Sequence, residues 1–307
     1  MGKDEGWYAF FQDNHRYADI INGIGCGGIQ FIQASDLEEA DTTEKSKSRD
    51  LLRKVALGVN YAIVGIENQE VIDYELPLRT MQYDVSRYQK QASEIGKEVR
   101  LQREGLSAGE YMYGFKSESR LHPIVTFAIY AGEEPWAGAT SLHDILDFTN
   151  MPEHLKNMVS DYKINVVDIR QMENTDVFKT DVKHVFDFIR YAENKEKLFQ
   201  LVESDEYYQH MEKDAFEVVT KYTNSKDLVN IERYELEGGK RNVCKAIRDL
   251  IEDGKAEGRE EGREEGREQG IRCSINMLRK IGKTDDEIIK LIMEEYKLEE
   301  GQLQVYL

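Results

Sequence analysis

The chain has 307 residues, which exceeds the usual domain size of about 100–200 residues, so we expect more than one structural unit. Hydrophobic residues make up 40% of the chain and charged residues 33%, and the formal net charge is -18. This composition excludes fibrous and collagen-like proteins. The acidic balance also argues against a protein that coats nucleic acid without specificity, because phosphate would be repelled.

The sequence contains no signal for membrane insertion or secretion. Its apolar runs fall far short of the roughly 20 residues that cross a bilayer, and the acidic N-terminus lacks the pattern of a signal peptide. We therefore expect a cytoplasmic protein with no membrane partner. The 3 cysteines are widely separated and include no Cys-x-x-Cys pair, which indicates neither a disulfide framework nor a zinc site.

The first predicted element is a helix over residues 7–24. Apolar residues recur there at three- and four-residue steps, and Gly25 follows the last of them. A short strand is expected next, over 28–33. The stretch 34–48 is polar and rich in Asp, Glu, Ser and Thr, so it is expected to form a loop.

A β-hairpin is predicted from two strand-like segments, 49–55 and 61–69, which are separated by a turn at 58–60. Alternate residues of a strand share a face, so Glu67 and Gln69 are expected to point the same way. Asp50 lies on the preceding segment and can come next to them. Two converging carboxylates would suit Mg²⁺, although exposed strand acids without a metal are the commoner outcome of such a pattern.

A long helix is predicted over residues 78–103, after Pro77, with Met81 and Val85 on its apolar face. Three basic residues of this helix could form a positively charged surface, with a solvated helix face as the alternative for each. They are Arg79, Arg87 and Lys90.

The following segments complete a mixed α/β pattern. Residues 122–130 form a continuous apolar run that predicts a buried central strand, and 162–169 predicts another strand. From residue 177 onward the apolar periodicity is helical. The order of elements predicts an α/β domain with a mixed sheet, followed by a mostly helical region.

The C-terminal region contains an internal repeat, in which glycine recurs at every fourth residue from Gly254 to Gly270. Five glycines weaken a helix by roughly 4–5 kcal/mol, so a marginal, solvated helical spacer is one interpretation. The other is a surface for self-association. Beyond the repeat, Thr284 and Glu287 predict a capping box that starts a small terminal helix.

Several strings resemble one known family. They are RYADIIN at 16–22, GIENQ at 65–69, PLR at 77–79, YD at 83–84 and PIVTF at 123–127. Together with the glycine-glutamate repeat, they resemble the Rpn-like recombination-promoting nucleases and transposases of bacteria, a branch of the PD-(D/E)XK nuclease superfamily. The resemblance implies a restriction-endonuclease-like mixed sheet core flanked by helices.

The resemblance also implies a domain organisation and a function. We expect a nuclease-like core over 1–175, a helical region packed on it over 176–250, a charged repeat helix or linker over 251–270, and a small helical tail over 271–307. The implied function is a Mg²⁺-dependent DNA endonuclease that hydrolyses phosphodiester bonds in recombination or transposition. The alternative is a weak or inactive nuclease-fold scaffold that self-associates, or binds a partner, through its C-terminal region.

By the same resemblance, Asp50, Glu67 and Gln69 are the catalytic residues. Asp50 and Glu67 would hold Mg²⁺, with Mn²⁺ or Ca²⁺ as alternatives. Gln69 stands where the superfamily usually has lysine, and an amide can orient water but carries no positive charge. Asp19 would lie near the metal, or else cap a neighbouring segment or face solvent. Tyr88 and Gln91 would approach the site from the long helix. The basic residues of that helix, Arg79, Arg87 and Lys90, would contact DNA phosphates.

Overall fold

The computed structural model describes residues 3–39, 51–57, 60–102, 105–222, 234–298 and 306. The chain divides into two compact units, residues 1–244 and 245–307. Among the described residues, no helix is long and apolar enough to cross a membrane.

The first unit contains a sheet and its flanking helices. Its described strands are β1 (Leu37–Glu39), β2 (Leu51–Leu57), β3 (Asn60–Gln69), β4 (Ile124–Tyr130) and β5 (Asn165–Asp168). Its described α-helices are α1 (Lys3–Phe11), α2 (Asn14–Ile20), α3 (Leu76–Leu101), α4 (Ala108–Tyr113), α5 (Glu153–Lys156), α6 (Val182–Tyr191), α7 (Lys195–Ser204) and α8 (Lys213–Val219).

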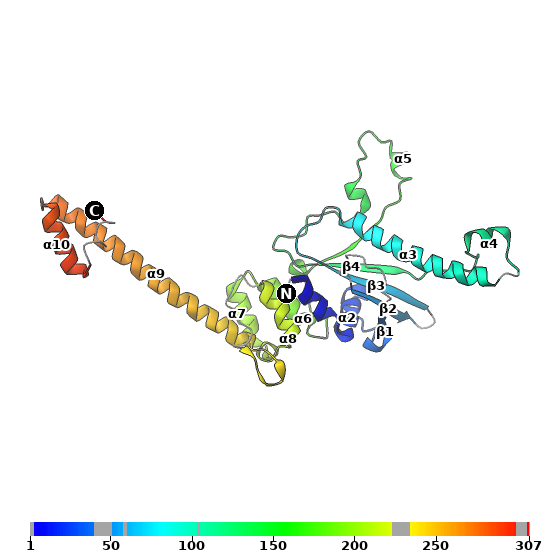
Figure 1. The fold of residues 1–307 in the computed structure, drawn as a ribbon, viewed down its shortest axis with the longest axis horizontal. Helices are drawn as coiled ribbons and strands as arrows, with labels where there is room; N and C mark the ends of the chain where they lie inside the picture. Colours follow the sequence, from blue (N-terminus) through cyan, green and yellow to red (C-terminus); the bar gives the residue numbers. More distant parts are fainter. Residues whose placement is uncertain are drawn as a thin grey trace. The chain divides into compact units, whose positions relative to one another are not determined.

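The sheet is mixed, with the strand order β1-β2-β3-β4-β5. β2 pairs antiparallel with β1 and β3, whereas β4 pairs parallel with β3 and β5. The helix α3 lies along one side of the sheet and α2 on the other (Figure 1). This arrangement confirms the predicted α/β class, and it brings the carboxyl ends of β3, β4 and β5 to one edge.

Three predicted elements are confirmed with small changes in their bounds. The hairpin is formed by β2 and β3, the apolar run at 122–130 forms β4, and the segment at 162–169 forms the shorter β5. Of the predicted turn at 58–60, residues 58 and 59 lie outside the described residues. The helices expected after residue 177 are present as α6, α7 and α8.

The N-terminal predictions need two corrections. The single helix expected over 7–24 is two helices, because Asp13 caps α2 by accepting hydrogen bonds from the backbone N–H groups of His15 and Arg16. The strand expected over 28–33 is wrong. Its backbone is bonded instead by the Asn22 side chain, which accepts from the N–H groups of Phe31 and Ile32.

A short strand, β1, lies within the polar stretch that was expected to be a loop. Leu37 is buried there and pairs with Val55 of β2. One apolar residue facing the core is enough to add these three residues to the sheet edge. Residues 40–48, the rest of the predicted loop, lie outside the described residues.

The long helix α3 is confirmed, but its buried face is not the predicted one. Val85 is 43% exposed, whereas Thr80 and Asp84 are buried, along with Leu76, Gly96 and Val99. The buried position of Asp84 is explained by its hydrogen bonds to partners on the sheet side, which are described below. The apolar pattern alone therefore did not predict which face of this helix is buried.

An aromatic cluster joins the N-terminal helices to the helical region that follows the sheet. Trp7 of α1 is buried, stacks on Phe11 at 5.2 Å between ring centroids, and meets Phe186 of α6 edge to face. The indole N–H of Trp7 donates to the hydroxyl of Tyr222 at 2.7 Å. Burial of several large rings together provides much of the apolar stabilisation of this part of the unit.

The second unit is helical. It is formed by α9 (Val243–Lys280), which begins just before the unit boundary, and by α10 (Asp285–Tyr296). The glycine repeat is helical, and residues 252–269 are all exposed. A small core forms from isoleucines of both helices, and the predicted capping box of Thr284 and Glu287 is confirmed. The buried isoleucines are Ile271, Ile275, Ile288 and Ile292.

Candidate functional site

The candidate site lies at the end of the β2–β3 hairpin. Glu67 pairs through its backbone with Ala128 of β4, and Gln69, which is 8% exposed, pairs with Tyr130. Asp50 lies outside the described residues, and of Glu67 the structure describes the backbone. Leu51, which follows Asp50 in the sequence, pairs with Ile66, which precedes Glu67.

Tyr17 of α2 holds this end of the hairpin. Its ring is buried, and its hydroxyl lies 2.9 Å from the carbonyl oxygen of Leu51 and 2.7 Å from that of Val64. The hydroxyl thus contacts one backbone group on each strand of the hairpin. A buried hydroxyl with two such partners fixes the position of α2 against the strand that carries Glu67 and Gln69.

Asp19 has the capping role that the sequence left as an alternative. Its carboxylate is 2% exposed and accepts hydrogen bonds from the N–H groups of Lys179 and Thr180 and from the Thr180 hydroxyl. These bonds, at 2.7–2.9 Å, engage both carboxylate oxygens. Asp19 therefore orders the turn that leads into α6.

Arg16, in the same string, also joins separate segments. Its guanidinium forms a two-pronged ion pair with Asp181 at 2.7 Å and a second ion pair with Asp214. Burial lowers the pKa of Arg16, but the hydrogen bonds and charges of the two carboxylates outweigh burial and raise it overall. Tyr207 donates to Asp181 at 2.8 Å, which completes the partners of that carboxylate. The polar residues of this string are structural.

Tyr88 and Gln91 contact the beginning of β4. The Tyr88 hydroxyl accepts from the N–H of Ile124 at 3.1 Å, and the Gln91 amide exchanges two hydrogen bonds with the backbone of His122. Ala128, which pairs with Glu67, lies four residues further along β4, or about 13 Å at 3.3 Å per residue. The structure therefore places the polar ends of both side chains away from the level of Glu67.

The basic candidates Arg79 and Arg87 on α3 are paired with carboxylates of the same protein. Arg79 pairs with Asp73 at 2.6 Å, and Arg87 lies 3.7 Å from Asp84 with 18% of its side chain exposed. Lys90 lies about one turn beyond Arg87 and is half-buried. A DNA phosphate would have to compete with Asp73 and Asp84 for these arginines.

Asp84 was missed by the sequence reasoning as a buried acid. It is 5% exposed and accepts hydrogen bonds from Thr126 at 3.3 Å and from Tyr162 at 2.6 Å. Burial, together with the hydrogen bond to Asp84, raises the pKa of Tyr162 above its ordinary value. The available signal was its spacing, because Asp84 follows Leu76 and Thr80 at four-residue steps on the face that packs.

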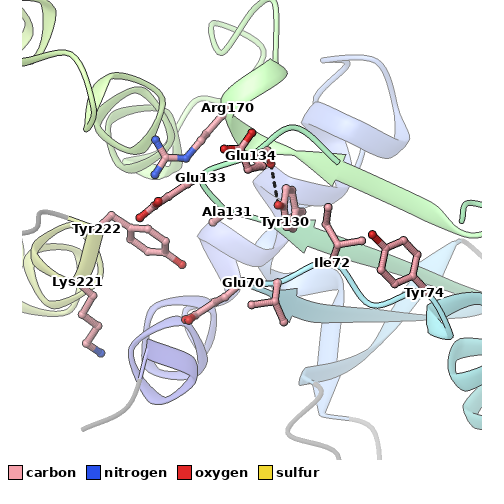
Figure 2. Close-up of a pocket in the computed structure, with 12 residues that line it drawn as sticks. Glu70, Ile72, Tyr74, Tyr130, Ala131, Glu133, Glu134, Arg170, Lys221 and Tyr222 are labelled. Carbon is pink, nitrogen blue, oxygen red and sulfur yellow. Dashed lines mark hydrogen bonds between the residues drawn. The ribbon is translucent and has the colours of Figure 1, made fainter. Parts of the chain in front are cut away.

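A pocket of about 490 Å³ opens where the β3–β4 pair ends (Figure 2). It starts at Glu70, directly after Gln69, and at Ala131, whose N–H donates to the Gln69 carbonyl at 3.0 Å. Its lining residues come from four separate segments of the chain. They are Glu70, Val71, Ile72, Tyr74, Tyr130, Ala131, Gly132, Glu133, Glu134, Arg170, Lys221 and Tyr222.

Hydrogen bonds made by Tyr130 and Asp168 order one wall of this pocket. The Tyr130 hydroxyl donates to the carbonyl of Glu134 at 2.7 Å, as drawn in Figure 2. The Asp168 carboxylate accepts from the N–H of Trp136 at 2.9 Å and from that of Arg170 at 3.0 Å. A side chain at Gly132 would collide with the Tyr130 ring, so glycine is required there.

Arg170 lines the pocket with a nearly buried side chain, of which 8% is exposed. Its guanidinium lies 3.9 Å from the carboxylate of Glu193. Among the residues that the structure describes, its Nε has no hydrogen-bond partner. A buried guanidinium donor without a partner destabilises the folded state, so the position of Arg170 at the pocket has a cost. No local pattern in the sequence marked Arg170.

These observations define an α/β protein whose mixed sheet is flanked by helices. Its hairpin carries the acidic residue Glu67 near its end. The chain belongs to the family "Putative transposase, YhgA-like", whose model matches residues 39–218. Membership supports a transposition-related function and confirms the family that the sequence motifs indicated. No curated protein and no solved structure matches the chain. Within the described residues, no group of three or more His, Cys, Asp or Glu side chains forms a metal cluster.

Proposed function

We propose that this protein is a divalent-metal-dependent DNA endonuclease that acts in the cytoplasm and serves transposition or recombination. The observation that carries the proposal is the register of the hairpin, in which Leu51 pairs with Ile66. The residues next to that pair in the sequence are Asp50 and Glu67. The family membership supports a role on DNA.

The proposed donor set suits a hard cation. Asp50 and Glu67 offer carboxylate oxygens, which are ligands that Mg²⁺, Mn²⁺ and Ca²⁺ take in proteins. When bound, the metal would polarise the scissile phosphate and lower the pKa of a bound water. Asp50 and Glu67 would hold it, and the Gln69 amide, at the buried end of β3, would orient the attacking water.

Gln69 sets an expectation for the rate. An amide donates a hydrogen bond to the developing oxyanion but carries no charge, so its stabilisation of the transition state is smaller than that from lysine. We propose slow turnover for the parent protein. A Gln69→Lys variant tests this directly, since an unchanged cleavage rate would contradict the argument.

The decisive experiment is incubation of supercoiled plasmid with the full-length protein, with and without Mg²⁺. We expect metal-dependent nicking that falls at least 100-fold, about 2.7 kcal/mol of activation free energy, in Asp50→Ala and in Glu67→Ala. Glu38→Ala, an exposed acid of β1, is the matched control and should cleave like the parent. Nicking that survives both site substitutions would place the activity elsewhere or in a contaminant.

A second proposal, self-association through the C-terminal region, is favoured by the exposed repeat helix. Residues 252–269 are all exposed, and a side chain at Gly258 or Gly262 would meet open space. Packing on a second copy would stabilise a helix that its glycines weaken. We expect light scattering to show an oligomer for the parent and a monomer for Gly258→Leu/Gly262→Leu. A monomeric parent would contradict this proposal.

A further inference from the structure

The pocket at the end of the β3–β4 pair has the position of a ligand site. Open parallel strands bind ligands beyond their carboxyl ends, and ligand pockets commonly have volumes of about 300–1,000 Å³. This pocket, of about 490 Å³, begins one residue after Gln69. Nothing in the proposed hydrolysis uses its lining.

The lining combines aromatic rings with hydrogen-bonding groups of both kinds. Tyr74 lies at one end of the pocket, and Tyr222 and Lys221 lie at the other (Figure 2). Tyr74 is 65% exposed, so its ring is available for stacking. Carboxylates from Glu70, Glu133 and Glu134 supply acceptors, and Arg170 supplies a donor. This is the chemistry that recognises a heteroaromatic ring carrying both amino and carbonyl groups.

The charge of the pocket lining indicates which part of a nucleotide the pocket would bind. Three carboxylates and two cations surround the space, so a phosphate group would meet an excess of negative charge. A neutral base meets no such repulsion. Guanine fits the set best, because carboxylates accept from its N–H groups while an arginine donates to its O6 and N7 atoms.

We propose that this pocket binds one unpaired guanine of the DNA strand that is cut. The proposal rests on the proposed function, whose substrate class it makes specific. A base that is paired in a duplex has its Watson–Crick edge covered, so the base must be unpaired or extruded to enter the pocket. The protein would therefore prefer bulged, gapped or single-stranded DNA to continuous duplex.

The spacing along the sheet agrees with this proposal. From Glu67 to Glu70 the chain advances three residues, about 10 Å along an extended strand. Stacked nucleotides advance about 3.4 Å each, so a phosphate held at Glu67 and a base held beyond Glu70 are separated by about three nucleotides of one strand. One strand of DNA reaches both places.

The test measures binding of labelled short DNA by fluorescence anisotropy, using the full-length parent without divalent metal. The DNAs are a continuous duplex, the same duplex with one bulged guanine, and one with a bulged thymine, which has no amino group. We expect the guanine bulge to bind about tenfold more tightly than the duplex, the size of one base stacking on an aromatic side chain, and more tightly than the thymine bulge.

Two exposed pocket residues provide variants that should fold, Tyr74→Ala and Glu133→Gln. Each is expected to abolish most of the preference for the guanine bulge and to leave duplex affinity unchanged. Tyr113→Ala and Glu118→Gln, at exposed positions outside the pocket, are the matched controls and should keep the preference. Free guanosine should compete with the bulged DNA.

The outcomes separate the two proposals. Equal affinity for bulge and duplex, or a preference that survives both pocket variants, overturns the base pocket while the plasmid assay decides the nuclease activity independently. Competition by guanosine without any preference among the DNAs would mean a site for a free nucleoside, and it also overturns the proposal. Guanine-bulge binding by a protein that never cleaves plasmid would support the pocket and contradict the nuclease.

Discussion

At the scale of single residues, the string at 16–22 shows how a motif shared with a known family can be structural. Arg16 joins α2 to the carboxylates of Asp181 and Asp214, and Asp19 caps the turn before α6. Asn22 holds the backbone of Phe31 and Ile32. In this string, the strongest link to the proposed chemistry is Tyr17, through the hairpin that it holds.

Tyr17→Phe is expected to cost about 1 kcal/mol of the free energy of unfolding, because one buried hydroxyl loses its carbonyl partners while the ring remains. We also expect slower plasmid nicking, since the hairpin end is held less firmly. Urea denaturation measures the first effect and the nicking rate the second.

Tyr88→Phe is the matched control, because it also removes one hydroxyl, at the other end of the sheet. It should cost similar stability with a smaller effect on nicking. If Tyr88→Phe slowed nicking more than Tyr17→Phe, the active site would have to lie near the start of β4 instead.

At the scale of elements, the sequence predicted what depends on local periodicity. The hairpin follows from two strand-like runs around a turn, and β4 from a continuous apolar run bounded by proline and glycine. The break at Asp13 was missed because apolar spacing continues across it, and the rotation of α3 was wrong because its buried face is partly polar. Tertiary partners decide both features.

The candidate site divides in the same way. Glu67 and Gln69 were found by strand alternation and by resemblance, because they lie two residues apart on one strand. The pocket was not found, since its lining is assembled from segments near residues 70, 131, 170 and 221. Pairing of β3 with β4 brings the first two segments together, and single-sequence patterns do not specify such long-range pairing.

The capping box of α10 gives a prediction for pH. Hydrogen bonds from Lys283 and from the Thr284 backbone lower the pKa of Glu287 below its ordinary value of 4.5. A carboxyl group whose pKa is lowered by folding stabilises the folded state above that ordinary value, and this contribution is lost as pH falls through the lowered pKa. We expect hydrogen exchange of the α10 amides to become faster as the pH is lowered through that range.

Glu287→Gln should remove most of this pH dependence. Glu294→Gln, at an exposed position of the same helix, is the control and should retain it. The exchange rates are corrected for the intrinsic effect of pH. If they change equally with pH in both variants, the capping box is not responsible.

At the scale of the whole molecule, the exposed repeat of α9 is expected to be the first place that a protease cuts when the protein is dilute enough to be a monomer. Each glycine weakens the helix by about 1 kcal/mol relative to alanine, so local opening is frequent there. Arg259, Arg263 and Arg267 lie within the exposed stretch and are sites for trypsin. Brief digestion should yield a fragment that contains the whole first unit, as measured by mass spectrometry.

Gly258→Ala/Gly262→Ala should slow this cleavage several-fold, because alanine restores helix propensity without adding a large side chain. The rate of any cut elsewhere in the chain should not change. A first cut within α3 or the sheet would mean that the first unit opens more easily than the repeat.

The position of β3 also bears on the order in which the chain folds. Its antiparallel partner β2 is adjacent in sequence, whereas its parallel partner β4 comes only after α3 and α4. Hairpins form in about 1–10 μs, but a contact across so long a crossover forms more slowly. During synthesis, the hairpin can therefore exist before Tyr130 and Arg170 have been made. A truncated product ending before Ile124 would carry the acidic strand without the pocket, and so without the proposed site for a base.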